Sequence, residues 1–96
     1  MARAAGNWNM ALPDVNTIRA RAGLSALASV DADGFFDERG KEMFQESSRR
    51  TDRIRFGKWG ESWWQKTNSD AYRTVFPIPQ EQINASGGSL TQNPGY

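Results

Sequence analysis

The sequence predicts a mainly α-helical fold, in which an αα-hairpin is followed by an irregular, aromatic-rich tail. Two segments, at about 13–22 and 34–49, carry the signals that start and stop helices. The last forty residues, 57–96, hold three of the four prolines and three of the four tryptophans. Proline and glycine clusters interrupt regular structure, so this part of the chain is expected to be loop and extended backbone.

The first helix is predicted at about 13–22, after a loose segment at 1–12. Pro13 suits the first turn of a helix, where its missing N–H has no partner to lose. Asp14 places a negative charge near the positive end of the helix dipole. Gly23 can adopt the left-handed conformation after the last turn, with Leu24 completing a Schellman-type cap.

The second helix is predicted at about 34–49. Asp31 and Asp33 are both suitable N-caps. Gly40 lies on the apolar face of this helix and would let a neighbouring backbone approach closely. Because about ten residues join the two helices, they are expected to form an αα-hairpin.

The rest of the chain is expected to hold little regular structure. One further helical turn is predicted at 52–56, followed by a polar, tryptophan-rich loop at 57–70. The segment 75–79 must be extended, because each of its two prolines disfavours helix in the residue before it. A short helical turn at 79–83 and a loop at 85–96 complete the chain.

Composition excludes several classes of function. The 96 residues make one small domain at most, or a piece of a larger one, and 12 basic against 11 acidic residues leave a net charge of +1. That balance gives no long-range attraction for nucleic acid or for an anionic membrane. The sequence has no Cys and no His, which excludes disulfides, thiol nucleophiles, Cys/His zinc sites and histidine acid–base chemistry. No residue implies a metal or another cofactor. The first residues lack the apolar stretch of a secretory signal, so for an exported protein we expect the signal to lie outside this chain.

Charged residues concentrate in the second helix and the segment after it. Glu38 and Glu42 are close enough on a helix face to act as the carboxylate pair of a glycoside hydrolase. The neighbouring arginines would instead hold them ionised, which favours a structural role. Arg50 and Asp52 are expected to cross-link the second helix to the following segment. The predicted structural ion-pair network comprises Glu38, Arg39, Glu42, Arg50, Asp52 and Arg55.

Basic residues also gather beside aromatic ones between 49 and 64. Such a mixture can form a platform for single-stranded nucleic acid. Glu46, Asp52 and Glu61 dilute the cluster, and a solvated helix end is the favoured interpretation.

The tryptophan-rich loop has two interpretations. Trp63 and Trp64 offer flat faces on which a pyranose can stack, and Gln65, Asn68 and Asp70 supply groups for its hydroxyls. Trp63 and Trp64 are therefore candidate glycan-binding residues. Alternatively, both rings pack the loop onto a scaffold, since Trp is usually largely buried.

Four stretches of the chain, in order, carry the motifs of one protein family. Val15–Leu24 is similar to a "VRxRAGL" helix end, and Glu38–Met43 to an "ERxxEL" helix with Met43 in place of Leu. Glu46–Lys58 is similar to "EGxRxxDLxRxG", with Ser and Arg where Gly and Leu are expected. Phe76–Pro79 and Leu90–Tyr96 are similar to "FPIP" and "LxQNPGY". Over about residues 13–96 the chain thus resembles the C-terminal end of SusD/RagB family proteins.

The resemblance implies a fold, a function and a location. Residues 1–96 would be a single C-terminal fragment of a SusD/RagB-like domain, part of its TPR-like helical-repeat scaffold. Family members are cell-surface lipoproteins of the outer membrane that capture oligosaccharides for import by a TonB-dependent transporter of the SusC type. The resemblance implies that they are not enzymes and that their glycan contacts come mainly from loops upstream of this segment. They contact the membrane through a lipid anchor, which we expect to lie outside this chain.

Two other functions remain open from the sequence. One is a standalone helical protein-interaction module, whose apolar face would dock another protein. The other is an accessory glycoside hydrolase.

Overall fold

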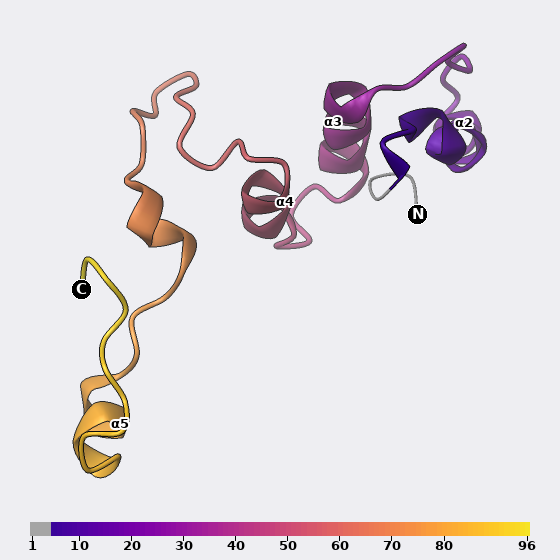
Figure 1. Cartoon of the computed structure of the whole chain (residues 1–96). Helices are drawn as coiled ribbons and strands as arrows, with labels where there is room; N and C mark the ends of the chain where they lie inside the picture. Colours follow the sequence, from indigo (N-terminus) through magenta and orange to yellow (C-terminus); the bar gives the residue numbers. More distant parts are fainter. Residues whose placement is uncertain (1–4) are drawn as a thin grey trace. The chain divides into compact units, whose positions relative to one another are not determined.

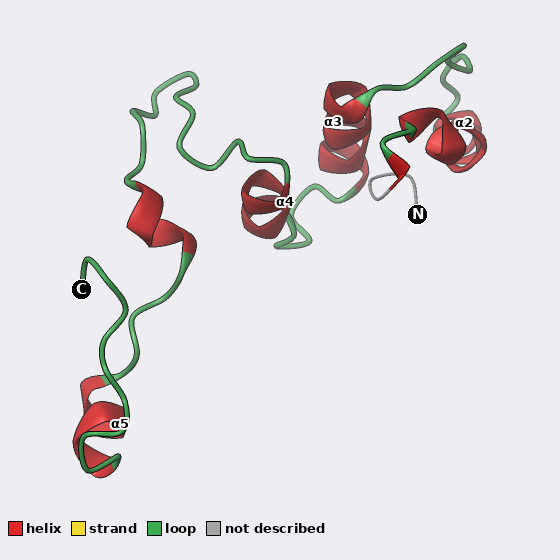
Figure 2. Ribbon diagram, viewed as in Figure 1, coloured by secondary structure: helices red, strands yellow, loops and turns green. Residues whose placement is uncertain are grey.

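The chain is mainly helical in the computed structural model, which describes residues 5–96 (Figures 1 and 2). Those residues form no strand beyond an isolated bridge between Trp63 and Lys66. None of the helices in this range has the length and apolar character needed to cross a membrane. The predicted fold class is confirmed. The elements are the 3₁₀ helices η1 (Trp8–Ala11) and η2 (Ala71–Thr74) and the α-helices α2 (Leu12–Arg21), α3 (Ala32–Glu42), α4 (Arg49–Arg55) and α5 (Gln80–Ala85).

The chain divides after Phe56 into two compact units, which are described separately. In the first unit, α2 ends as its sequence predicts. Gly23 has a φ of 72°, in the left-handed region. The Leu24 N–H donates to the Arg19 carbonyl at 2.8 Å, and the Gly23 N–H donates to the Ala20 carbonyl at 3.0 Å. These two bonds are a Schellman motif, and α2 ends at Arg21, two residues before the glycine.

The second predicted helix, 34–49, is corrected by the structure. It begins earlier, because the Asp31 side chain caps it by accepting from the Gly34 N–H at 2.7 Å. It ends at Glu42, since Gln45 and Ser47 have φ values of 65° and 59°. A right-handed helix cannot continue through left-handed residues, so α4 starts anew after the break.

The core of the first unit is small and aromatic. Phe36 is only 4% exposed, and Val15 and Val30 are buried beside it. The Trp8 ring lies 5.4 Å from Phe35 and 5.3 Å from Phe56, centroid to centroid. Residues 1–12 were expected to be a loose segment; 1–4 lie outside the described residues, but η1 contributes Trp8 to this cluster.

Side-chain amides hold the connector between α2 and α3. The Asn16 amide donates to the Leu27 carbonyl at 3.0 Å and accepts from the Leu27 N–H at 2.8 Å. Asn9 in η1 accepts from the Val30 N–H at 2.8 Å. These bonds satisfy extended backbone that has no strand partner.

Side-chain amides also bind extended backbone in the second unit. The Gln92 amide accepts from the Ile78 N–H and donates to the Ile78 carbonyl, both at 2.8 Å. The Asn93 amide donates to the Phe76 carbonyl at 2.7 Å. The Tyr96 hydroxyl donates to the Val75 carbonyl at 2.9 Å. The last residues of the chain are thereby bound alongside the segment 75–78, where the two extended traces cross beside α5 in Figure 1.

The hydrogen bonds of Gln92 predict that the second unit loses stability when the N–H₂ donor of this side chain is removed. Gln92→Glu replaces an amide N–H₂ by an oxygen facing the Ile78 carbonyl, and we expect it to cost about 1–3 kcal/mol of local stability. Gln82→Glu makes the same charge change at an exposed position of α5 and is the matched control. Amide hydrogen exchange should show lost protection at Ile78 in the first variant alone. Equal protection in both variants would contradict the assigned role.

Candidate functional site

A buried carboxylate joins α3 to α4. Asp52 is 2% exposed, and its Oδ2 accepts from the Arg39 Nε at 2.7 Å. Arg55 adds a weaker contact from the same helix, with its Nη1 4.0 Å from Asp52 Oδ1. Arg50 lies in the first turn of α4 and is half-buried. A charge removed from water in this way requires its partner to stay in place.

Two further ion pairs join α3 to α2. Glu38 Oε1 accepts from Arg19 Nη1 and from Lys41 Nζ, each at 2.9 Å. Glu42 pairs with Arg21 closer to the surface. The six residues of the predicted network therefore lie on α3 and α4. Sequence reasoning did not identify the partners on α2, since Arg19 and Arg21 are about twenty positions from the carboxylates that they contact.

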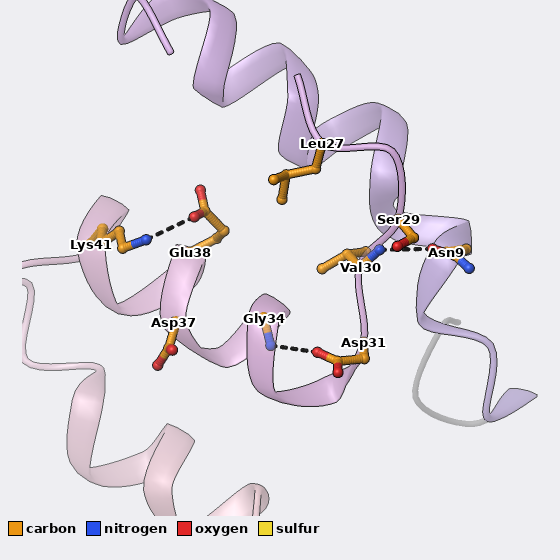
Figure 3. Close-up of a pocket in the computed structure, with 9 residues that line it drawn as sticks. All are labelled: Asn9, Leu27, Ser29, Val30, Asp31, Gly34, Asp37, Glu38 and Lys41. Carbon is orange, nitrogen blue, oxygen red and sulfur yellow. Dashed lines mark hydrogen bonds and ion pairs between the residues drawn. The ribbon is translucent and has the colours of Figure 1, made fainter. Parts of the chain in front are cut away.

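A polar pocket of about 480 Å³ lies between the connector, η1 and α3 (Figure 3). Its carboxylates already bind groups of the fold: Asp31 caps Gly34, and Glu38 faces Lys41. The pocket is lined by Asn9, Leu27, Ser29, Val30, Asp31, Gly34, Asp37, Glu38 and Lys41.

The electrostatics of this pocket do not suit acid catalysis. The hydrogen bond from Lys41 lowers the pKa of Glu38 below its ordinary value; burial acts in the opposite direction, and Arg19 lowers the pKa further. A general acid for glycoside cleavage needs a raised pKa instead. Glu38 and Glu42 are both ion-pair partners of basic residues. Over residues 5–96, no group of acidic side chains is arranged to hold a metal ion.

Arg49 is a structural residue that sequence reasoning missed. Its guanidinium carbon lies 3.6 Å from the centroid of the Phe36 ring, and its Nη1 donates to the Phe36 carbonyl at 2.8 Å. A Cβ at Gly40 would lie 2.7 Å from the same guanidinium carbon. The close approach predicted at Gly40 exists, but a side chain rather than a backbone makes it.

The two candidate glycan-binding tryptophans lie on one loop of the second unit, residues 60–69, here called the Trp loop. Trp63 and Lys66 exchange backbone hydrogen bonds of 3.2 and 2.8 Å, so residues 63–66 form a tight turn. Gln65 takes the left-handed position of that turn, with a φ of 60°. Trp64, beside it, is 83% exposed, and Trp63 is 49% exposed.

The ammonium group of Lys66 stabilises the Trp loop through contacts with other residues of the same loop. Lys66 Nζ donates to the Thr67 carbonyl at 2.8 Å and to the Glu61 carbonyl at 3.3 Å. The same nitrogen lies 4.6 Å from the centroid of the Trp63 ring. These contacts fix Trp63 and leave the face of Trp64 to solvent.

An open hollow of about 690 Å³ lies at the base of the Trp loop. The Ser69 N–H donates to the Gly60 carbonyl at 3.3 Å and closes the loop there. Hydroxyls, an amide and a carboxylate surround the hollow, and these groups bind sugar hydroxyls by donating and accepting hydrogen bonds. The lining residues are Gly60, Glu61, Ser62, Asn68 and Ser69.

Known proteins resemble most of this chain. The profile of the SusD family matches residues 2–96. The starch-binding protein SusD of Bacteroides thetaiotaomicron is 30% identical over 93 residues, which cover 86% of this chain and 17% of that protein. The solved structure of surface glycan-binding protein A from Bacteroides thetaiotaomicron matches with a TM-score of 0.75 and 30% identity, covering 97% of this chain and 21% of that one. The chain spans about a fifth of the length of these relatives.

The ion pair of Asp52 with Arg39 predicts that two arginine substitutions differ in their cost to stability. Arg39→Met removes the 2.7 Å partner of the buried Asp52 carboxylate, and we expect it to cost about 3 kcal/mol of unfolding free energy. Arg21→Met removes an arginine that is 70% exposed, and its cost should stay within about 1 kcal/mol. Urea unfolding of both variants measures the difference. Similar losses of unfolding free energy in both variants would show that the buried Asp52 pair contributes no more than an exposed ion pair.

Glu38 predicts a pH dependence of stability. Since folding lowers its pKa, the stability it contributes is present above its unfolded value of about 4.3 and is lost as the pH falls through the folded value. Glu38→Gln should therefore be destabilised relative to wild type at pH 7, and this gap should shrink below about pH 4. Urea midpoints from pH 7 to about pH 2.5 test this, with the exposed Glu46→Gln as control. A gap that is independent of pH would contradict the ion-pair assignment.

Proposed function

The chain belongs to the SusD family, and from this membership we propose that it is part of a cell-surface glycan-binding protein that captures oligosaccharides. The match over residues 2–96 is the observation that carries the proposal. One relative is named for binding starch, and another is named as a surface glycan-binding protein. Family members bind carbohydrates and are not enzymes. No residue is assigned a catalytic role, in agreement with the lowered pKa of Glu38.

The family also supports a location and a partner. We propose that the protein acts at the outer membrane, on the cell surface, and that it passes its oligosaccharide to a TonB-dependent transporter of the SusC type. Both steps concern the whole protein, of which this chain matches about a fifth.

Within this chain, the Trp loop is the segment that we propose to contact glycan. An aromatic face carries negative charge density and attracts the C–H groups of a sugar ring. Trp64 is 83% exposed, so its ring has a face available for such stacking, and Trp63 beside it is 49% exposed. The adjacent hollow supplies Asn68 and Ser62 for hydroxyls. An aromatic surface beside a few convergent polar groups is the usual composition of a ligand site.

A second candidate function is a protein-interaction module. Phe44 is 76% exposed in the first unit, and Phe76 is 69% exposed in the second. Exposed rings of this kind mark docking surfaces when they gather into patches. Concentration-dependent self-association in sedimentation experiments, without glycan binding, would favour this function over the first.

The glycan proposal predicts a selective effect of the exposed ring. Trp64→Ala should weaken binding to the best-bound polysaccharide by roughly threefold to tenfold, because one stacking contact contributes about 0.5–1.5 kcal/mol. Retardation in gels that contain a panel of polysaccharides measures the effect. Phe44→Ala removes an equally exposed ring outside the Trp loop and is the matched control.

Two outcomes of this experiment would count against the proposal. Equal retardation of the Trp64 and Phe44 variants would remove the Trp loop from the binding site. Absence of binding to any polysaccharide in the panel would overturn glycan capture by this chain.

A further inference from the structure

Gln65 lies at the tip of the Trp loop, next to Trp64 in the chain. We propose that Gln65 is a further glycan-binding residue, whose side-chain amide binds two neighbouring hydroxyls of the sugar that stacks on Trp64. The inference rests on the proposed function, because it concerns the ligand of the same loop. It adds a residue that recognises the hydroxyl pattern of the sugar, and with it a ligand class, glycans that carry a free pair of neighbouring hydroxyls.

The backbone of Gln65 has a conformation that glutamine rarely adopts. Its φ is 60°, in the left-handed region. It is the third residue of the turn that the Lys66 N–H closes by donating to the Trp63 carbonyl at 2.8 Å. A residue with a Cβ is strained in this region, whereas glycine is not. Strained residues cluster at ligand sites, so the conformation of Gln65 indicates a function for its side chain.

A second turn of the chain, residues 43–46, shows such strain with a structural use. Gln45 takes the same third position there, with a φ of 65°, and the Glu46 N–H donates to the Met43 carbonyl at 3.1 Å. That turn directly follows α3, so its left-handed residue ends a helix. The turn of the Trp loop adjoins no helix. Its left-handed glutamine therefore has no helix to end, which favours a role for the side chain instead.

The side chain of Gln65 is available to a ligand. The residue is exposed, and no group within residues 5–96 forms a hydrogen bond with its amide. A glutamine amide carries an acceptor oxygen and two N–H donors, while a hydroxyl can both donate and accept. One amide can therefore bind two neighbouring sugar hydroxyls at once. Trp64 is exposed as well, so a single turn carries both a stacking surface and this amide.

The test removes the amide and keeps the length of the side chain. Gln65→Met retains an unbranched side chain and the left-handed strain, but it cannot bind hydroxyls as an amide does. It should weaken binding to the best-bound polysaccharide by roughly threefold to tenfold. Gln45→Met makes the same change at the equivalent position of turn 43–46 and should bind as wild type does. Retardation in gels that contain the polysaccharide measures both variants.

A glycine substitution separates binding from the stability of the turn. Gln65→Gly removes the left-handed strain, so hydrogen exchange of the Lys66 N–H, which closes the turn, should slow. The same variant lacks the amide, so its affinity should fall as it does in Gln65→Met. A residue that only maintained the turn would not give a more stable turn together with weaker binding.

The ligand class is tested with a second probe, the same polysaccharide with part of its hydroxyls methylated. A methyl ether accepts a hydrogen bond but cannot donate one, so a methylated pair cannot satisfy the amide oxygen. Wild type should bind the native polymer more tightly, by roughly threefold or more. Gln65→Met should reduce this ratio, and Gln45→Met should leave it as it is in wild type.

Each outcome distinguishes this inference from the proposal on which it rests. Wild-type binding by Gln65→Met, with weaker binding by Trp64→Ala, would overturn the role of Gln65 while the Trp loop stands as the site. Equal losses of affinity in Gln65→Met and Gln45→Met would also overturn that role. A ratio between the two polymers that Gln65→Met leaves unchanged would overturn the recognition of paired hydroxyls. If neither polymer binds, or if Trp64→Ala binds as wild type does, the Trp loop fails as the site and the role of Gln65 fails with it.

Discussion

The buried pair of Asp52 and Arg39 is the constraint on which the first unit depends. Few apolar side chains are fully buried there, with Phe36 at the centre, so the hydrophobic contribution to stability is small. Asp52 is nevertheless 2% exposed, and its carboxylate is stable only while the Arg39 guanidinium stays 2.7 Å away. The pair therefore sets the position of α4 against α3, and through it the position of Phe56 in the aromatic cluster.

A second constraint comes from extended backbone that has no sheet to join. Buried N–H and C=O groups need partners, and here side-chain amides provide them. Asn16 binds both backbone groups of Leu27, and Gln92 binds both backbone groups of Ile78. Each side-chain amide thus makes the pair of hydrogen bonds that a residue of a neighbouring strand would make. This explains how a chain with so little regular structure in its second unit still holds its last residues in place.

Local rules predicted the elements with local causes. The φ of Gly23 and the extended 75–79 segment follow from the conformations that glycine and proline allow. The break between α3 and α4 was not predictable in this way, since Gln45 and Ser47 have positive φ values although neither is a glycine. The ion-pair partners of Glu38 and Asp52 could not be predicted either, because they lie far away in the sequence. The exposure of Trp64 depends on the turn at 63–66, for which the sequence carries no turn signal.

The basic and aromatic residues between 49 and 64 show how contacts in the fold can change an interpretation based on composition. In sequence it resembled a platform for nucleic acid, which would need cations directed at solvent beside free rings. In the structure, two members of this mixture contact groups of the first unit: Arg49 lies over the Phe36 ring, and Arg55 Nη1 lies 4.0 Å from Asp52 Oδ1. Arg49 thereby joins α4 to α3, and Arg55 is paired within α4, which favours a structural role for these two charges.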